Sequence, residues 1–195
     1  MKIIVIENAY RGSLGERTSV HVYPDTCIFR NNDPFYVPDI DCKYSIKAGI
    51  YLKINKIGKC IESEYAYRYI SHIGIALSFT NETLVQALIK QNAFTTPAYC
   101  SDRSLGISNE MIAFEPERVQ KLLFRLKINK TELLFTPGMF KFSIAEMISA
   151  SSHYFTIKIG DLIFLPFYRT DKEISINSII DCLLYDNHLL RCQIK

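Results

Sequence analysis

Apolar and polar residues alternate along residues 44–54, which read YSIKAGIYLKI. Successive side chains of a β-strand point to opposite faces, so this alternation predicts a strand with one apolar face. The opposite face carries Ser45, Lys47, Gly49, Tyr51 and Lys53. A second apolar segment at 70–79, ISHIGIALSF, predicts another strand. One of its faces carries His72, Gly74, Ala76 and Ser78.

A helix, a turn and a buried strand are predicted next to one another in the C-terminal half. Ser143 and Glu146 form a capping-box pattern, and the apolar spacing after them predicts a helix that ends near residue 155. Gly160 then permits a turn, because glycine adopts positive φ without steric cost. The apolar run 162–165, bounded by a proline, predicts a buried strand.

The remaining segments predict a mixture of strands, short helices and loops. These are a strand at 2–6, extended chain at 20–29 interrupted at Pro24, a short helix at 61–69, a helix at 82–91 capped by Thr80 or Asn81, a long irregular loop at 92–110, a strand at 118–129 followed by a turn and a loop, and a closing hairpin at 179–194 that turns at Asp186-Asn187. No repeat or linker divides the chain. We therefore expect a single α+β domain over residues 1–195, with the strand and loop region 1–40 packed on it.

Composition and charge narrow the classes of function. Of the 195 residues, 48% are hydrophobic and 22% are charged, which are ordinary values for a globular domain. The net charge of +3 comes from scattered lysines and arginines, so we expect no nucleic-acid partner. No apolar stretch is long enough to span a bilayer, and the one at the N-terminus is too short for a signal peptide. We therefore expect a cytoplasmic protein without membrane association.

Several short patterns that could carry chemistry have plainer explanations. The six cysteines include no C-x-x-C pair and none at metal-ligand spacing from a histidine, so we interpret them as small buried residues. Cys100 would need a base to act as a nucleophile, and the sequence supplies none. Asp39 and Asp41 could form a displaced metal pair, but a polar loop is the better interpretation. A lone histidine such as His72 is more often a hydrogen-bonded structural residue than a base.

The sequence resembles a known family over nearly its whole length. The similar stretches are MKIIVIENAY, DPFYVPD, YSIKAGIYLKI with its GKCI turn, HIGIALSFTNETLVQ, and the helix followed by IKIGDLI. In these stretches the chain resembles the short single-domain form of the fumarylacetoacetate hydrolase family. The resemblance implies a β-rich, mixed α+β roll or sandwich around a pocket, usually in a homodimer. It also implies binding of Mg²⁺ or a similar ion, and hydrolysis, decarboxylation or isomerisation of small keto acids.

The resemblance fails at the positions that hold the metal in the family. Two glutamates on one strand correspond to Lys47 and Gly49, and the aspartate of an Asp-Phe-Thr corresponds to Ser78. Residues 43–60 contain no acid, so shifting the alignment by one residue restores none. A hard cation needs several oxygen ligands, chiefly carboxylates. We therefore expect that the metal site is lost and that the protein has no metal cofactor.

Other positions implied by the resemblance are partly changed and partly kept. A histidine of the family corresponds to Ser13, a lysine to Tyr99, and the threonine of a Gly-Thr-Pro to Phe167. The matching residues are Tyr10, Asp102 and Ser104. The candidate pocket, in which no catalytic residue is assigned, thus comprises Tyr10, Ser13, Lys47, Gly49, Ser78, Tyr99, Asp102, Ser104 and Phe167.

Two functions follow from these residues. The loss of the metal carboxylates favours a pseudoenzyme of the family that binds a ligand or a partner chain. The alternative is a metal-independent or rearranged-site hydrolase, isomerase or decarboxylase of a small keto acid. Lys47 bears on both: inside the former pocket it would be a fixed cation that no carboxylate at those positions neutralises, able to attract a small organic anion. Equally, its side chain could reach solvent at an open strand edge.

Overall fold

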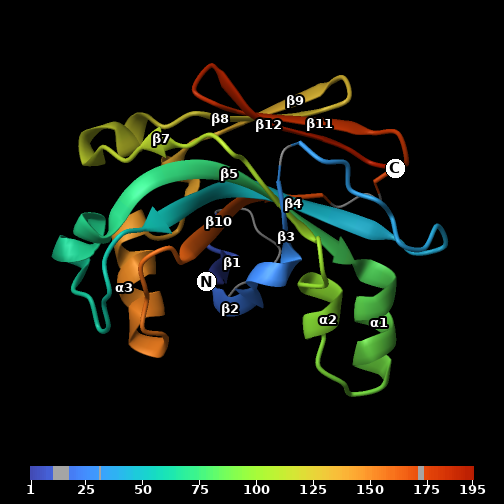
Figure 1. Cartoon of the computed structure of the whole chain (residues 1–195), viewed down its shortest axis with the longest axis horizontal. Coiled ribbons are helices and arrows are strands. Elements are labelled where there is room, and N and C mark those ends of the chain that lie inside the picture. The colour runs from blue at the N-terminus through green and yellow to red at the C-terminus, as the bar shows by residue number, and fades with distance from the viewer. Residues whose placement is uncertain (11–17, 31, 171–173) are drawn as a thin grey trace.

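The computed structural model describes residues 1–10, 18–30, 32–170 and 174–195, which form two β-sheets and several helices (Figure 1). The strands are β1 (Lys2–Glu7), β2 (Ser19–Pro24), β3 (Ile28–Phe29), β4 (Tyr44–Ile54), β5 (Ile70–Asn81), β6 (Leu105–Ile107), β7 (Ile112–Ala113), β8 (Phe124–Ile128), β9 (Thr131–Phe135), β10 (Leu162–Arg169), β11 (Ile179–Leu184) and β12 (Asn187–Gln193). The α-helices are α1 (Glu82–Lys90), α2 (Thr96–Tyr99) and α3 (Ile144–Tyr154). Short 3₁₀ helices cover Asp25–Cys27, Ser63–Tyr69, Pro116–Lys121 and Pro137–Met139.

The larger sheet is curled and has the strand order β2-β1-β10-β4-β5-β6-β3, with β7 paired to β5. The long strands β4 and β5 are antiparallel, and β10 continues the sheet on the other side of β4. Strand β1 is parallel to β10 and lies between β10 and the edge strand β2. The smaller sheet, β12-β11-β8-β9, packs across one face of the larger one, and α1 and α2 lie on the opposite side (Figure 1).

Alternation along β4 and β10 sorts side chains into two separate cores. One face packs between the two sheets and includes Ile46, Ile50 and Phe167. The other face points toward the N-terminal strands and α2, and includes Tyr51 and Phe164. Lys47 belongs to this second face, because it lies four residues from Tyr51 on the same strand.

The main predicted helices and strands are confirmed. The first long strand spans 44–54 as predicted, and α3 begins with a capping box in which the Ser143 N–H donates to Glu146 at 2.7 Å. Asn81 caps α1 by accepting the Leu84 N–H at 2.9 Å. The short segment 61–69 is helical as predicted, but as a 3₁₀ helix over Ser63–Tyr69.

The predicted strand at 118–129 is wrong in its first half. Residues 116–121 form a 3₁₀ helix, and the strand begins only at Phe124. Val119 and Leu122 are both buried, and their spacing of three residues fits one face of a 3₁₀ helix rather than a strand. After a positive-φ turn at Asn129 the chain returns as β9, a strand that the sequence pattern does not predict.

Three further boundaries differ from prediction. The strand expected to stop at Pro166 continues as β10 to Arg169, and the register with β4 shifts between Pro166 and Tyr168. Such an irregularity accommodates a proline, which has no N–H to give to the ladder. The loop at 92–110 contains α2 and β6. The closing hairpin turns at 185–186, where Tyr185 has positive φ, one residue earlier than predicted.

Candidate functional site

The candidate site lies on the face of the large sheet that is covered by α1 and α2. On this face Lys47 pairs with Ser78 of β5 on one side and with Arg169 of β10 on the other. Paired residues in antiparallel strands point to the same face, so the three side chains start from neighbouring positions. Ser45 and Thr80 form the next pair along the same two strands.

The Lys47 side chain is buried and forms an ion pair with Glu7. Its side chain is 3% exposed, and its ammonium donates to the carboxylate of Glu7, the last residue of β1, which is 14% exposed. The hydroxyl of Tyr23 also donates to Glu7, at 3.4 Å. The Lys47 side chain therefore points into the protein and does not reach solvent. Glu7, which directly follows the predicted strand 2–6, neutralises the ammonium, so the expectation of a cation without a neutralising carboxylate is wrong.

The ring of Tyr99, at the end of α2, covers the same ammonium. Lys47 Nζ lies 4.6 Å from the Tyr99 ring centroid, a cation–π contact. The ring also stacks on His21 at a centroid distance of 6.3 Å. Burial raises the pKa of Tyr99, and the negative charge of Glu7 adds to that increase. Tyr99 is thus a neutral aromatic cover that contacts both an exposed histidine and a buried amine.

Burial has the largest effect on the pKa of Lys47. Removal from water lowers the pKa of Lys47, and the nearby positive charge of Arg169 acts in the same direction. The ion pair and hydrogen bond with Glu7 oppose this decrease, as does the charge of Glu82, but the pKa stays below its ordinary value. The amine is therefore easier to deprotonate than an exposed lysine.

A second ion pair lies beside the first. Arg169 Nη2 contacts Glu82 Oε1 at 2.7 Å, and the hydroxyl of Ser45 donates to the same carboxylate oxygen. Glu82 is the first residue of α1, where the positive end of the helix dipole favours a carboxylate. The site therefore holds two cations and two carboxylates, which together carry no net charge.

Two hydroxyls on the neighbouring strand β5 have no hydrogen-bond partner in the described part of the chain. Ser78 Oγ and Thr80 Oγ1 are both fully buried and start from the same face of β5. A buried hydroxyl without a partner is costly, so each is available to a water molecule or a ligand. Ser104 Oγ also has no partner among the described residues. Ser104, however, lies beside Phe79, whose side chain points to the opposite face of β5 from that of Ser78.

Gly49 has no room for a side chain. A Cβ atom there would lie 2.1 Å from the carbonyl oxygen of Leu165 and 2.7 Å from the Cα of Pro166. The β10 backbone therefore occupies the space that a carboxylate at this position would need. On the same face of β4, the two positions that do carry side chains beside Ser78 and Thr80 are Lys47 and Ser45.

Several predicted pocket residues lie outside this cluster. Phe167 points into the core between the sheets, where its ring stacks on Phe140 at 4.6 Å, because it alternates with Pro166 along β10. Tyr10 packs on the rim of that core, with its hydroxyl 3.4 Å from the Met139 sulfur. Asp102 is exposed in a turn. Ser13 falls outside the described residues.

The plainer explanations of other residues are confirmed only in part, since Cys60 is exposed and Cys42 and Cys100 are only partly buried. Asp39 accepts the Asp41 N–H at 3.0 Å, as in a polar turn. Cys100 donates its thiol to a carbonyl oxygen, and burial raises its pKa, which disfavours the reactive thiolate. His72, expected to be hydrogen bonded, has a buried Nδ1 without a partner among the described residues. Within those residues, no three His, Cys, Asp or Glu side chains gather as they would around a metal ion.

The site residues that sequence reasoning missed are Glu7, Glu82 and Arg169. Glu7 continues the spacing of Ile3 and Val5, so the pattern indicated which face it shares. Its partner could not be predicted, because that depends on β10 lying between β1 and β4. Arg169 was hidden by the expected strand end at Pro166.

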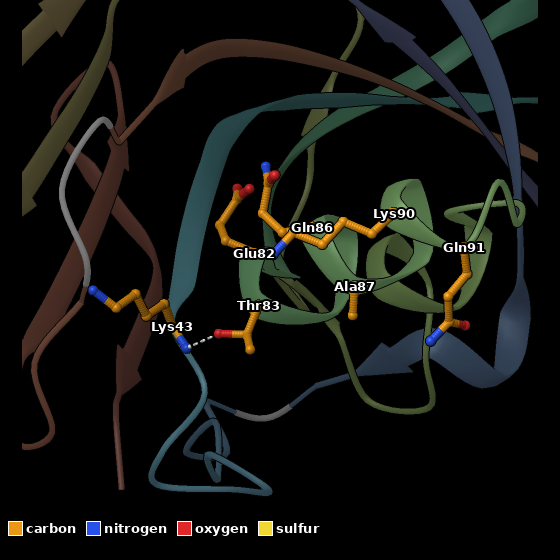
Figure 2. Close-up of a pocket in the computed structure, with 7 residues that line it drawn as sticks. All are labelled: Lys43, Glu82, Thr83, Gln86, Ala87, Lys90 and Gln91. Carbon is orange, nitrogen blue, oxygen red and sulfur yellow. Dashed lines mark hydrogen bonds between the residues drawn. The ribbon is translucent and has the colours of Figure 1, made fainter.

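An open groove runs along the outer side of α1, next to this cluster (Figure 2). Its volume is about 530 Å³, and it is lined by Lys43, Glu82, Thr83, Gln86, Ala87, Lys90 and Gln91. Thr83 accepts the Lys43 N–H at 2.9 Å, and Figure 2 shows Glu82 and Gln86 pointing to the same side. Glu82 connects the groove to the ion pair with Arg169.

The sequence of this strand-rich, curled α+β chain matches a known family. Residues 9–165 match the model of the fumarylacetoacetate (FAA) hydrolase C-terminal family. The chain belongs to this family, as its resemblance in sequence predicted. Comparison with curated proteins finds no sequence match.

Solved structures share the fold at low sequence identity. A protein assigned to the fumarylacetoacetate hydrolase family from Yersinia pestis CO92 is 18% identical, with a TM-score of 0.86 over 100% of this chain and 92% of that one. Fumarylpyruvate hydrolase from Pseudomonas aeruginosa, in complex with Mn²⁺ and pyruvate, is 14% identical, with a TM-score of 0.87 over 100% and 89%. 5-Carboxymethyl-2-hydroxymuconate delta-isomerase from Mycobacterium smegmatis is 14% identical, with a TM-score of 0.82 over 99% and 78%. Within the described residues of our chain, no helix has the length and hydrophobicity needed to cross a bilayer.

Proposed function

We propose that this family member is a pseudoenzyme that has lost the divalent metal site and retains a pocket for a small ligand or a partner chain. The observation that carries the proposal is the buried ammonium of Lys47, paired with Glu7, at the position that the sequence resemblance aligns with a metal ligand of the family. An ammonium there repels a divalent cation and occupies the nearest carboxylate. The residues present do not fit a hard cation, which needs several free oxygen ligands.

The charge balance of the cluster supports the same proposal. Lys47 and Arg169 supply two fixed positive charges, and Glu7 and Glu82 supply two negative charges. These ion pairs stand where a divalent cation and its carboxylates would otherwise stand. An ammonium cannot hold two substrate oxygens in fixed geometry or polarise them as a metal ion does. Loss of the metal-dependent reaction follows.

Metal analysis tests this proposal directly. We expect purified protein to contain no stoichiometric Mg²⁺ or Mn²⁺, and titration calorimetry with either ion to give no site binding. The fumarylpyruvate hydrolase from Pseudomonas aeruginosa, solved with Mn²⁺, serves as the positive control. One ion per chain, lost on Ser78→Ala, would overturn the proposal.

A small organic anion is the candidate ligand that the site favours. Glu7 neutralises Lys47, but Arg169 is 44% exposed and the hydroxyl of Ser78 has no described partner. A thermal-shift screen of keto and dicarboxylic acids should find stabilisation that Arg169→Ala abolishes, with Lys47→Ala as a second variant. No shift with any acid, or a shift that neither substitution changes, contradicts an anion site here.

The alternative is a metal-independent enzyme acting on a small keto acid. A buried amine beside a carboxylate, with an unpartnered hydroxyl opposite, is the observation in its favour. Turnover of a keto acid that resists EDTA and disappears in Lys47→Ala would support it. The absence of turnover across a keto-acid panel would support the pseudoenzyme.

A further inference from the structure

The outer face of α1 is hollowed and carries a charge pattern that complements itself. The groove along this face has a volume of about 530 Å³ and is lined by two rows of α1 side chains (Figure 2). Glu82, Gln86 and Lys90 form one row at spacings of four residues, so an acid, an amide and a base follow one another along the helix. We propose that a second copy of this chain docks on this face, with its α1 antiparallel to this one.

An antiparallel arrangement brings opposite charges together at both ends of the contact. A two-fold axis beside Gln86 places Glu82 opposite the partner's Lys90, and Lys90 opposite the partner's Glu82. Gln86 then meets its own copy, and two glutamine amides can each donate to the other and accept from it. The two helix dipoles are also opposed, so the positive end of each helix lies beside the negative end of its neighbour.

The second row of side chains lets the two helices approach closely. Thr83, Ala87 and Gln91 form this row, and Ala87, at its middle, has only a methyl group. Helix axes pack about 8 to 10 Å apart, and small side chains at the contact give the shorter separations. The dipole of any helix favours an acid at its start and a base at its end, but it requires neither a hollow nor a small central residue. Those two features select this face of α1.

Both charged residues of the first row are available for the contact. Arg169 and the Ser45 hydroxyl bind Glu82 through Oε1, and Oε2 accepts no hydrogen bond from the described residues. Lys90 is exposed, and its ammonium has no ion pair or hydrogen bond within the described part of the chain. Lys43, the other cation of the groove, directs its ammonium away from α1 (Figure 2).

Exposed apolar side chains border the same face. Ile89 follows Gln86 by three residues, so it lies on the same side of α1, and it is 54% exposed. Phe94, in the segment that follows α1, is 91% exposed. Ion pairs at a surface contribute little by themselves, so we expect burial of this apolar area to supply most of the affinity.

The partner copy also contributes a residue to the candidate site. The partner's Lys90 reaches Glu82, which binds Arg169, and Arg169 is the cross-strand neighbour of Lys47. The contact therefore links the dimer interface to the charged cluster. This inference does not depend on loss of the metal site, because Glu82 and Lys90 lie outside the positions that the resemblance aligns with metal ligands.

A charge-swap experiment tests the proposed contact. Lys90→Glu places two acids opposite each other at both ends of the contact, and Glu82→Lys places two lysines there. Each variant alone should raise the dissociation constant of the dimer at least about tenfold, measured by sedimentation equilibrium. An equimolar mixture of the two variants should recover the affinity, because each contact then joins a lysine to a glutamate. Lys121→Glu, on an exposed residue of the 3₁₀ helix Pro116–Lys121, is the control and should leave the dissociation constant unchanged.

Disulfide crosslinking locates the two-fold axis without changing a charge. Gln86→Cys, in a Cys60→Ser background that removes the exposed native thiol, should form an intermolecular disulfide on mild oxidation, since position 86 meets its own copy. Gln120→Cys in the same background is the matched control, because its 3₁₀ helix lies far from α1 (Figure 1). Circular dichroism checks that each variant keeps the original fold.

Three results would each overturn the proposal. The first is a monomer mass for the original chain at every concentration. The second is a dimer whose dissociation constant changes with neither Lys90→Glu nor Glu82→Lys. The third is a dimer in which Gln86→Cys crosslinks no faster than Gln120→Cys. The last two results would place the contact between copies on another face of the chain.

Discussion

The ammonium of Lys47 lies 4.6 Å from the centroid of the Tyr99 ring, and the two residues come from β4 and α2, about fifty positions apart in the chain. This contact joins α2, which covers the site, to the long strand β4. Glu7, from β1, binds the same ammonium. One side chain therefore joins three separate segments, and its removal should affect stability as well as ligand binding.

The Lys47–Glu7 pair should show strong coupling in a double-mutant cycle. Lys47→Met alone leaves the Glu7 carboxylate poorly solvated and without its cation, and should cost about 3 kcal/mol of unfolding free energy. Lys47→Met combined with Glu7→Gln should recover most of that loss, because no buried charge remains. Urea unfolding of the two single variants and the double variant gives the coupling, with the exposed Lys121→Met as control. Additive effects would show that the ion pair contributes nothing of its own.

Gly49 should tolerate no side chain. Gly49→Ala places a Cβ atom against the carbonyl of Leu165 and should destabilise the protein by about 2 to 3 kcal/mol, the cost of overpacking. Gly138→Ala is the matched control, since its Cβ would meet no atom closer than 3.8 Å. Unfolding curves of both variants measure the difference. An unaltered Gly49→Ala would show that β10 moves easily away from β4.

Carboxylates placed at the paired positions of β4 and β5 should create metal binding. Lys47→Glu together with Ser78→Asp adds two acids on neighbouring strands and releases Glu7 from its ion pair. Millimolar Mn²⁺ should then stabilise the double variant by about 1 to 3 kcal/mol, the increment expected from binding to the folded state alone. The unsubstituted protein should show no such stabilisation. An equal response of both proteins to Mn²⁺ would mean that positions 47 and 78 do not face a common site.

The local structure could be predicted where short-range patterns decide it. The capping box at Ser143 and the alternation along 44–54 both depend on neighbours in sequence, and both are confirmed. The 3₁₀ helix before Phe124 was missed because apolar residues three apart resemble a broken strand pattern. Pro166 predicts a strand end from sequence alone, because the strand accommodates this proline only through a register shift against β4.

The site could be predicted only in part, because its contacts join distant strands. Residues that share one strand face, such as Lys47 and Ser45, follow from alternation alone. The pairing of Lys47 with Glu7 requires the order β1-β10-β4, which no local pattern specifies. The assignment of Phe167 to the pocket came from the resemblance, whereas its phase along β10 turns it into the core.

We predict that the protein is a homodimer, as the family resemblance implies. Several large apolar side chains, including Ile40, Ile57, Phe94 and Ile159, stay exposed in the single chain and give a dimer apolar surface to bury. Light scattering coupled to size exclusion should give twice the chain mass of 22.5 kDa. A monomer mass across a wide concentration range would count against the dimer.

Asp161 should control stability in acid, because it fixes the pairing of β1 with β10. Its carboxylate accepts the Lys2 N–H at 3.0 Å, the Lys158 N–H at 2.8 Å and the Lys2 ammonium, immediately before the first residue pair, Ile3 and Leu162. A pair of parallel strands has no hairpin turn to set its register, so these hydrogen bonds set the register instead. Asp161→Asn should cost about 2 kcal/mol or more at neutral pH.

The pH dependence of that loss identifies its cause. Burial raises the pKa of Asp161, but the hydrogen bonds from the Lys2 side chain, the Lys2 backbone and the Lys158 backbone outweigh it and lower the pKa below 3.8. Because the folded-state pKa lies below the unfolded one, the stabilisation is complete above about pH 5 and is lost as pH falls through the folded-state value. The gap in unfolding free energy between the original chain and Asp161→Asn should therefore shrink in acid, and the exposed Asp102→Asn serves as the control substitution at neutral pH. A gap that stays constant down to about pH 2 would mean that Asp161 acts through its shape and not its charge.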